Sequence, residues 1–158
     1  MWRIEGYFQG CGESYGEVKI VPLEPRHLLE IRVQDAQRNC DVALRNETNA
    51  QELARAGPAF TALESEIPIA CAGLAHCGSG RYLAWSVISP RGLERFGGIH
   101  RGVRRFLEIA DYRRIEAVVD VEHEKAIRWI EVLGFEREGV MRKYTENGRD
   151  VYLYARLK

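Results

Sequence analysis

The sequence predicts one α/β domain in which helices flank a central mixed β-sheet. Its 158 residues are enough for a single domain with a substantial core. Stretches with strand and helix periodicity are interspersed along the chain, an order typical of helices packed on a mixed sheet. One transition is especially clear, because residues 126–133 have a helical amphipathic pattern that stops at Gly134 and continues as a strand. Glycine tolerates the left-handed backbone with which helices commonly end.

The first third of the chain is expected to contain a strand and two helices. Residues 17–23 alternate between apolar and polar side chains, which indicates a strand. Pro25 opens a helix over residues 26–39, because the N–H that proline lacks would have no helical partner at that position. Thr48 is expected to cap a second helix over residues 49–56.

Strands dominate the middle of the chain. Three largely apolar stretches of strand length are separated by turn residues: 59–64, 67–75 and 81–89. Pro90 follows at once and disfavours helix at Ser89. A helix over residues 98–110 has one apolar face at steps of three and four, and residues 115–121 are expected to form a buried strand.

The two ends of the chain differ in how clearly they predict structure. Residues 151–157 alternate as expected of a strand with one face on the core, and Asn147-Gly148 before them favours a tight hairpin turn. Residues 1–16 are rich in glycine and aromatic residues. They are expected to form either a short packed strand or an extension that touches a partner.

The charge balance argues against two classes of partner. Lys plus Arg equals Asp plus Glu at 23 each, which gives no overall attraction to nucleic acid or to an anionic membrane. No apolar run approaches the roughly 18–20 residues that span a bilayer. The first residues do not have the pattern of a secretory signal. We therefore expect a cytoplasmic protein that binds neither nucleic acid nor membrane.

The cysteines are expected to be reduced thiols rather than metal ligands. Their spacings contain no Cys-x-x-Cys pair, and Cys71 lies in an apolar, strand-like stretch. The sequence therefore predicts no metal site. The cysteines concerned are Cys11, Cys40, Cys71 and Cys77.

Two motifs resemble the GNAT superfamily of acetyl-CoA-dependent N-acetyltransferases. The helix that ends in Leu133-Gly134-Phe135 is similar to the fourth helix of that fold, which lies beside the pantetheine arm. Arg95 and Gly98 match part of the family's phosphate-binding motif at the start of the third helix. The order of strands and helices is also similar, so the resemblance implies a GNAT-like fold.

The resemblance covers residues 17–158 as one GNAT-like domain and leaves residues 1–16 outside as an extension. Within the superfamily, the chain is most similar to the small GNAT-like proteins of bacteriophages and prophages. Residues 56–63 and 134–139 carry that similarity.

The resemblance implies acetyl-CoA as co-substrate. In this fold the pantetheine arm binds backbone groups of a strand end that corresponds to residues 85–89, and the pyrophosphate binds the N-terminus of the next helix. His100 departs from the motif, because an imidazole fills the room that a small residue leaves for phosphate, or contacts the phosphate itself. The implied cofactor-binding residues are Val87, Ile88, Ser89, Arg95, Gly97, Gly98, Ile99, His100 and Trp129.

Acetyl transfer requires a polarised thioester carbonyl, a deprotonated amine and a stabilised thiolate. Many GNAT proteins place a tyrosine in the fourth helix near the thiolate, but this chain has Ile130 there. His76 and Glu64 are alternative bases, and His123 fits a helix cap as well as a site residue. The candidate catalytic residues are Tyr82, Tyr144 and His123.

Two functions stay open from the sequence. The first is an acetyltransferase that acts on a small-molecule or protein amine by direct attack, without a covalent enzyme intermediate. The second is a GNAT-shaped protein without catalysis, which serves as a phage structural or interaction protein; Ile130 and His100 favour this alternative. A homodimer or a virion partner is compatible with the resemblance.

Overall fold

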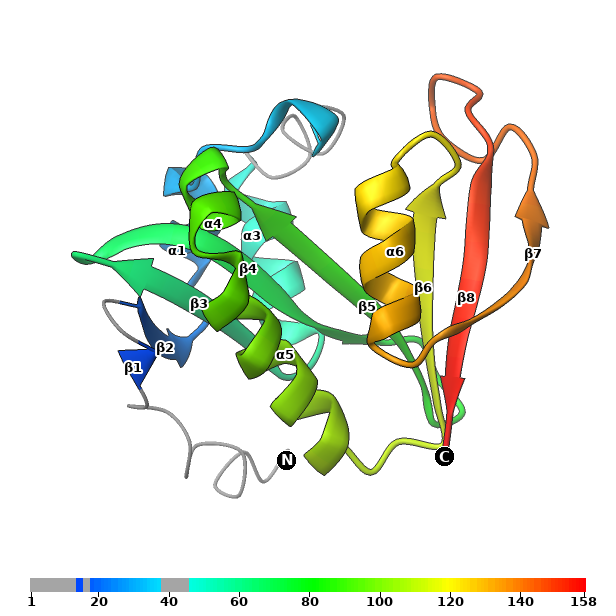
Figure 1. The fold of residues 1–158 in the computed structure, drawn as a ribbon, viewed down its shortest axis with the longest axis horizontal. Coiled ribbons are helices and arrows are strands. Elements are labelled where there is room, and N and C mark those ends of the chain that lie inside the picture. Colours follow the sequence, from blue (N-terminus) through cyan, green and yellow to red (C-terminus); the bar gives the residue numbers. More distant parts are fainter. Residues whose placement is uncertain (1–13, 16–17, 38–45) are drawn as a thin grey trace. The chain divides into compact units, whose positions relative to one another are not determined.

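The computed structural model describes residues 14–15, 18–37 and 46–158, and its elements are shown in Figure 1. Contacts divide the chain into two compact units: unit 1 is Met1–Ala75 with Trp85–Ala110, and unit 2 is His76–Ala84 with Asp111–Lys158. The elements are β1 (Ser14–Tyr15), β2 (Val18–Pro22), α1 (Pro25–Glu30), η2 (Asp35–Gln37), α3 (Glu47–Arg55), β3 (Ala59–Glu64), β4 (Ile67–His76), β5 (Arg81–Ile88), α4 (Pro90–Glu94), α5 (Phe96–Ile109), β6 (Arg114–Asp120), α6 (Glu124–Val132), β7 (Glu136–Met141) and β8 (Val151–Leu157).

Unit 1 contains the antiparallel strands β1 to β4 in sequence order, followed by the second half of β5. Ser65 and Glu66 form the turn between β3 and β4, with φ of 49° and 64°. Positive φ at both central positions gives the turn the twist of a hairpin. The turn therefore fixes the register in which Glu64 lies opposite Ile67.

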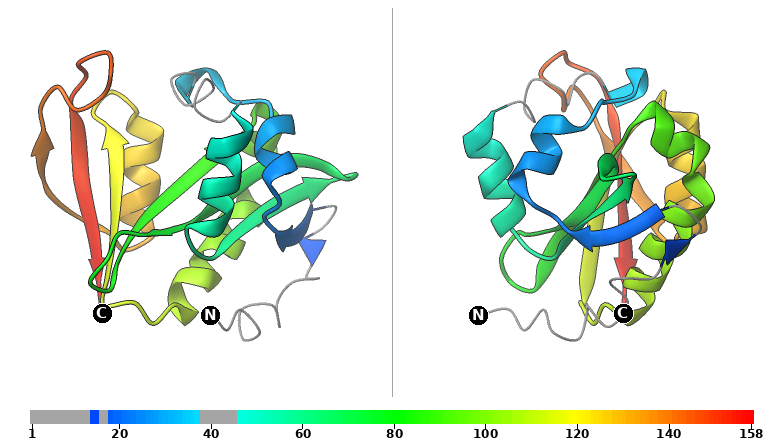
Figure 2. Two further views of the ribbon diagram at one scale, coloured as in Figure 1. Left: turned by 180° about the vertical axis from the view of Figure 1, so that it is seen from behind. Right: turned by 90° about the vertical axis from the view of Figure 1, so that its left-hand side faces the viewer.

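Helices cover both faces of the sheet in unit 1. Figure 2 shows α1 and α3 on one face and α5 on the other. Between α1, α3 and the sheet lies a core of Leu28, Ile31, Ala50, Cys71 and Val87. Burying a large aliphatic side chain contributes about 1.5–3 kcal/mol, so this layer is a main source of stability for unit 1.

The helix α4 begins directly at the end of β5 because Ser89 caps it. Ser89 Oγ accepts from Gly92 N at 3.0 Å, while Ser89 N and Oγ each donate to Ile69 O at 2.9 Å. Gly92 then allows close contact with β4, because an added Cβ would lie 2.2 Å from Ile69 O. The start of the connection from β5 to β6 is thus fixed against β4.

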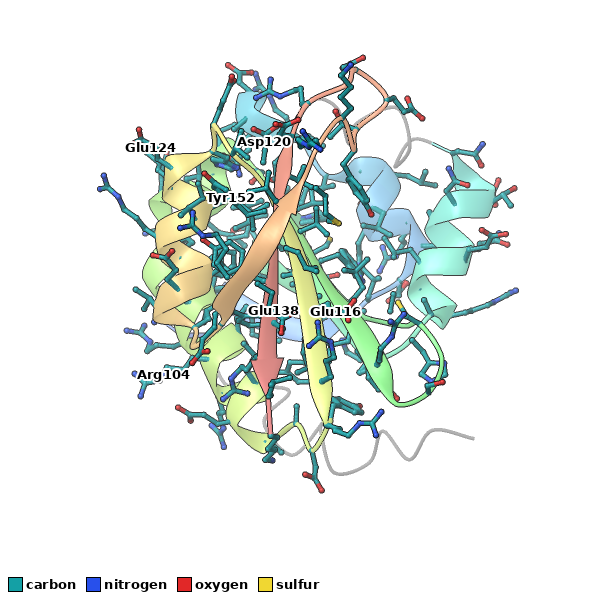
Figure 3. The ribbon with its side chains drawn as sticks, turned by 90° about the vertical axis from the view of Figure 1, so that its right-hand side faces the viewer. Arg104, Glu116, Asp120, Glu124, Glu138 and Tyr152 are labelled. Atoms are coloured by element: carbon teal, nitrogen blue, oxygen red, sulfur yellow. The ribbon has the colours of Figure 1, made fainter. Side chains whose placement is uncertain are left out.

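Unit 2 has the strand order β5, β6, β8, β7. The first half of β5 pairs in parallel with β6, and β8 runs antiparallel between β6 and β7. Arg114 of β6 donates to Glu116 on its own strand and to Glu138 on β7, so an ion-pair cluster spans β8 (Figure 3). The helix α6 lies along β6 and covers one face of these strands (Figure 1).

The helix α6 ends as the sequence predicts. Gly134 has a φ of 84° and donates to Glu131 O at 3.0 Å, and Phe135 N donates to Ile130 O at 3.2 Å. This pair of bonds is the Schellman motif, in which a left-handed residue satisfies the last helical carbonyls. Phe135 and Ile130 are both buried, as is common for the two apolar residues that flank this motif.

The expected helix over residues 26–39 is wrong in extent. The helix α1 ends at Glu30, Ile31 is extended, and a short turn over Asp35–Gln37 follows. The chain leaves the helix because Ile31 and Val33 pack into the α1–α3 core, which places Gln37 beside β5.

Two other local predictions need correction. Asn46, not Thr48, caps α3: its side chain accepts from the Thr48 and Asn49 amides, so α3 begins at Glu47. The predicted tight turn at Asn147-Gly148 forms, since Gly148 has a φ of 71° and donates to Thr145 O at 2.8 Å. It lies at the tip of a longer connection than expected, because Met141 and Val151 are the last paired residues of β7 and β8. Side-chain bonds, such as Lys143 N to Asp150 Oδ1 at 2.8 Å, hold this wider loop.

The predicted mixed α/β fold is confirmed. The expected extension over residues 1–16 falls mostly outside the described residues; Ser14–Tyr15 pair with β2. The helix expected from residue 98 begins at Phe96, and α4 adds a turn that the sequence pattern did not predict. None of the helices in the described ranges has the length and apolar character needed to cross a bilayer.

Gly92→Ala is expected to destabilise the protein, because its Cβ would meet the Ile69 carbonyl, which is backbone and cannot rotate away. Overpacking of this kind costs about 1–3 kcal/mol. Gly97→Ala is the matched control, since a Cβ at Gly97 meets nothing within 4 Å and alanine favours helix. Urea unfolding of both variants measures the effect. Equal stability of the two variants would contradict the close approach of α4 to β4.

Candidate active site

Two arginines at the start of the α4–α5 segment converge on one buried carboxylate. Glu64 Oε1 accepts from Arg95 Nε at 2.6 Å and from Arg91 Nη2 at 3.0 Å, and Glu64 Oε2 accepts from Arg91 Nε at 2.5 Å. The Glu64 side chain is only 10% exposed. These hydrogen bonds, first from Arg91 and then from Arg95, hold the pKa of Glu64 below its ordinary value. Glu64 is thus an ionised partner of the arginines and a poor general base.

The first turn of α5 contains the glycines of the predicted phosphate motif. Gly98 and Ile99 are buried, whereas Gly97 is exposed and an added Cβ there would meet nothing within 4 Å. His100 stacks on Phe96, with ring centroids 6.3 Å apart. A helix of this length has partial positive charge at its N-terminus, so the turn around Gly97 is suited to an anion.

The end of β5 directs alternate backbone groups to opposite edges of the strand. Ser89 N bonds to Ile69 O of β4, so Ser89 and Val87 face β4. The Ser89 O atom also accepts from Leu93 N at 3.0 Å. The backbone and hydroxyl of Ser89 are therefore engaged in strand pairing and helix capping.

Ser86 and Ile88 face the edge away from β4, and a side chain pairs with both. Gln37 Nε2 donates to Ser86 O at 2.8 Å, and Ile88 N donates to Gln37 Oε1 at 3.0 Å. The ladder between β5 and β6 ends earlier, at Ala84. Of Val87, Ile88 and Ser89, the three strand residues that the resemblance implies, Ile88 has its amide on the edge away from β4.

In unit 2, His123 lies at the junction between β6 and α6. It occupies the N-cap position without a side-chain capping bond, so the structure gives no support to a capping role for its ring. Burial lowers its pKa, against a smaller opposing effect of the Asp120 charge. A neutral imidazole at pH 7 can accept a proton.

An ion-pair network lies beside His123. Arg149 Nε bonds to Asp120 Oδ2 at 2.8 Å, and Arg149 Nη2 donates to Glu122 Oε2 at 2.7 Å. Burial opposes ionisation of Asp120, but the hydrogen bonds from Arg149 and from Glu122 N prevail and its pKa is lowered. Tyr144 belongs to the same loop, since its N donates to Arg149 O at 2.9 Å, and its side chain is exposed.

Tyr82 lies far from this network. It pairs with Ile115 near the start of β6, five residues before Asp120, which corresponds to roughly 17 Å of strand. The Tyr82 ring is buried and contacts the rings of Tyr112 and His76, at centroid distances of 4.0 and 5.2 Å. Arg149 therefore links the loop that carries Tyr144 to the segment that carries His123, while Tyr82 and His76 lie outside this network.

Comparison with solved structures identifies the fold. The chain is similar to a spermidine N-acetyltransferase chimera of Vibrio cholerae SpeG and hSSAT, with 20% identity, 90% of this chain and 96% of that chain covered, and a TM-score of 0.65. It is similar to Ard1 from Thermoplasma volcanium, with 13% identity, coverage of 90% and 98%, and a TM-score of 0.73. It is also similar to ribosomal-protein-S5-alanine acetyltransferase from Vibrio fischeri, with 13% identity, 92% of this chain and 95% of that chain covered, and a TM-score of 0.65.

The chain has the GNAT acetyltransferase fold. No family model and no curated protein matches the sequence.

The GNAT fold puts the side-chain differences of this chain into context. Ile130, at the position the resemblance aligns with the family's tyrosine, is a buried residue near the C-terminal end of α6. Trp129 beside it is half-buried. A phenol does reach α6 from β8, because Tyr154 Oη donates to Glu131 Oε1 at 2.9 Å. Burial, together with this bond to Glu131, raises the pKa of Tyr154, so its hydroxyl stays protonated.

Sequence reasoning missed Gln37 and the partners of Glu64. The pattern of residues 26–39 predicts a continuous helix, on which Gln37 would lie remote from any strand. Its contact with β5 depends on packing between segments about fifty residues apart in the sequence. The signal that was available is the cluster of arginines in residues 91–114, but nothing local indicates that Glu64 is their partner.

The thiol of Cys71 belongs to a buried polar chain rather than to a nucleophilic site. His27 Nδ1 accepts from Glu24 N at 3.1 Å and lies 2.9 Å from Thr61 Oγ1, which lies 3.7 Å from Cys71 Sγ. The Glu24 amide donates to Nδ1, so that nitrogen carries no proton. The Thr61 hydroxyl has one hydrogen and lies within reach of both Nδ1 and Cys71 Sγ. Burial raises the pKa of Cys71 to about 12, and the Thr61 contact only partly opposes this.

Cys71 is expected to resist alkylation in the folded protein. At about pH 8 only a small fraction is thiolate, so iodoacetamide should modify Cys71 at least about a hundredfold more slowly than the exposed Cys77. Peptide mass mapping after timed labelling measures both rates, and labelling in urea is the control. Equal rates in the folded protein would contradict the buried polar chain.

Protonation of His27 is expected to make the protein less stable in mild acid. Burial lowers the folded pKa of His27 below its ordinary value of 6.5. Below that value the unfolded chain binds the proton first, so stability is lost as the pH falls from 6.5 through the folded pKa. Urea unfolding at about pH 7.5 and about pH 5 measures the loss.

His27→Asn should show a smaller loss, because its Oδ1 can replace Nδ1 as the acceptor of Glu24 N without titrating. His76→Asn, at an exposed histidine, is the control and should keep the wild-type difference. An identical pH dependence in His27→Asn and wild type would refute this origin.

Proposed function

We propose that the chain is an acetyl-CoA-dependent N-acetyltransferase that acts on an amine by direct attack. One observation carries the proposal: in a chain with the GNAT fold, the outer edge of β5 carries backbone groups paired only by a side chain, and an arginine-bearing helical segment follows at once. A strand edge followed by a helix N-terminus suits a ligand with amides at one end and phosphates at the other.

The cofactor contacts proposed on β5 and α5 come from unit 1. Ser86 O would accept from an N–H of the pantetheine arm and Ile88 N would donate to a C=O of the arm, in place of Gln37. The two groups would come from the arm's two amides, because the N–H and C=O of one trans amide point in opposite directions. The first turn of α5 would hold the diphosphate, where Gly97 allows close approach and Arg95 supplies positive charge. Trp129, from unit 2, stays a candidate for the pantetheine arm by resemblance alone.

The reaction would be a single transfer. The amine nitrogen attacks the thioester carbonyl carbon, the C–N bond forms, and the C–S bond breaks. The nitrogen gives up a proton to a base, and the leaving thiolate takes a proton to become the CoA thiol. In this way the chain needs no nucleophile of its own, which agrees with the buried, protonated state of Cys71.

We propose His123 as the base, because its lowered pKa leaves a neutral imidazole at pH 7. Tyr144, whose side chain is exposed, is the proposed proton donor to the thiolate. Tyr82 is a weaker candidate for catalysis, since its ring is buried among aromatic neighbours. The acceptor would be a small or protein-borne amine, and the location the cytoplasm.

A protein without catalysis is the second candidate, and a specific observation favours it. Glu64 already pairs with both arginines, and Ile130 replaces the family's tyrosine with an alkyl chain. Such a protein would keep the GNAT shape as a structural or interaction protein, of a phage if the resemblance to that group holds.

Calorimetry with CoA, and release of thiol from acetyl-CoA with an amine panel, test the proposal together. The panel includes spermidine and the amine of an alanine, because two of the proteins with similar folds are named as a spermidine and a ribosomal-protein-S5-alanine acetyltransferase. Binding with amine-dependent thiol release is expected. Binding without release for every amine would favour the second candidate, and no binding by wild type or variants would refute the transferase.

Arg95→Ala should weaken CoA binding about tenfold or more, because it removes a charge-assisted contact to phosphate. Arg104→Ala is the matched control, since Arg104 lies farther along α5, is exposed and pairs with Glu108 of the same helix (Figure 3). His100→Gly should retain binding if the imidazole only fills space. Equal affinity of the Arg95 and Arg104 variants would argue against the diphosphate site.

A further inference from the structure

The Gln37 carboxamide makes with β5 the two hydrogen bonds that a neighbouring strand would make. Its Nε2 donates to Ser86 O at 2.8 Å, and its Oε1 accepts from Ile88 N at 3.0 Å. Both groups lie on the edge of β5 that faces away from β4. A side chain thereby satisfies a stretch of strand backbone that would otherwise lack partners.

The segment around Gln37 holds this side chain in place. Gln34 Nε2 donates to Gln37 Oε1 at 3.0 Å, and Gln37 N donates to Gln34 O at 2.9 Å. Val33 packs against the α1–α3 core, which ties the segment to unit 1. We call residues 34–37 the glutamine strap. Its carboxamide is oriented by the strap as well as by β5.

A ligand with two secondary amides offers the kinds of group that the Gln37 carboxamide uses here, an N–H donor and a C=O acceptor. Ile88 N has a single hydrogen and cannot donate fully to Gln37 and to a ligand carbonyl at once. Occupation of this edge by Gln37 and by a ligand amide is therefore mutually exclusive.

We infer that Gln37 is an internal competitor for the cofactor, so that the glutamine strap must release β5 before the pantetheine arm binds. This inference rests on the proposed function, because the competing ligand is acyl-CoA. In the closed state Gln37 is bonded to β5 and the pantetheine arm cannot bind there. In the open state Gln37 has left β5 and the arm can bind. The apparent affinity for CoA falls by the fraction of molecules that are open.

The test compares the affinity of CoA for wild type, Gln37→Ala and Gln37→Met. Methionine has nearly the length of glutamine without its donor or acceptor, so it separates hydrogen bonding from bulk. Both variants should bind CoA about three- to tenfold more tightly than wild type. The adenosine bisphosphate part of CoA, which lacks the pantetheine arm, should bind all three proteins equally.

Gln51→Ala is the matched control. Gln51 lies on α3 and donates to Glu47 Oε1 at 3.3 Å, remote in sequence from the strap. The same chemical change at this position should leave both affinities unchanged. A tighter Gln51 variant would mean that loss of any glutamine amide strengthens binding, and would overturn the assignment to Gln37.

The outcomes separate this inference from the proposed function. If wild type binds CoA and the Gln37 variants bind it equally or more weakly, the inference fails and the proposed function stands. If the variants bind CoA and wild type does not, both stand and the strap is strongly closed. If no protein in the set binds CoA, both fail.

Hydrogen exchange of single amides tests the contact itself. Ile88 N–H should exchange faster in Gln37→Ala than in wild type, while Ser89 N–H, which bonds to Ile69 O, should not change. Saturating CoA should restore the protection of Ile88 in the variant. Faster exchange at both amides would show general loosening of β5. If CoA did not restore the protection of the Ile88 amide, the ligand would bind elsewhere.

Discussion

The last residues of β5 must satisfy two edges of backbone with two different kinds of partner. Ser89 turns one edge toward β4 and uses its hydroxyl to begin α4. The carbonyl of Ser86 and the amide of Ile88 lie on the other edge, away from β4, and also need hydrogen-bond partners. Gln37 meets that need. The start of α4 at Ser89 and the candidate cofactor edge at Ile88 both follow from this division.

At the start of α5, a buried charge is also satisfied by side-chain partners. Glu64 is a nearly buried carboxylate at the end of β3, and a buried charge requires oppositely charged or hydrogen-bonding neighbours. Arg91 and Arg95 provide them, which orients both guanidinium groups from their turn of helix. The chain as a whole is electrically balanced, so any attraction for an anion at this place is local rather than global.

Features with local causes could be predicted from the sequence. Gly134 ends α6 because a left-handed residue is needed there, and Ser89 is extended because Pro90 follows. The alternation of β6 and β8 also indicates their buried faces. Thr48 was the wrong cap because Asn46 has an equally suitable side chain two residues earlier.

Long-range contacts explain the failures. Periodicity alone continues α1 beyond Glu30, whereas Ile31 and Val33 enter a core formed with α3. The family resemblance implies Tyr82 as a catalytic candidate, but its ring packs against Tyr112, thirty residues away along the chain. The pairing of Gln37 with β5 has no local signature at all. The residue type thus predicts what role a side chain could have, whereas the sequence does not predict which distant residues it contacts.

The carbonyl of Ile69 has a consequence for how a long, flexible ligand could be captured. It anchors Ser89 through two hydrogen bonds and lies against Gly92, so the β5 edge and the first turns of α4 belong to the same unit. A molecule that engages one of these places brings its other end within reach of the next at high effective concentration. Preorganisation of this kind reduces the entropy lost on binding. Two contacts that are weak individually can therefore give a high overall affinity.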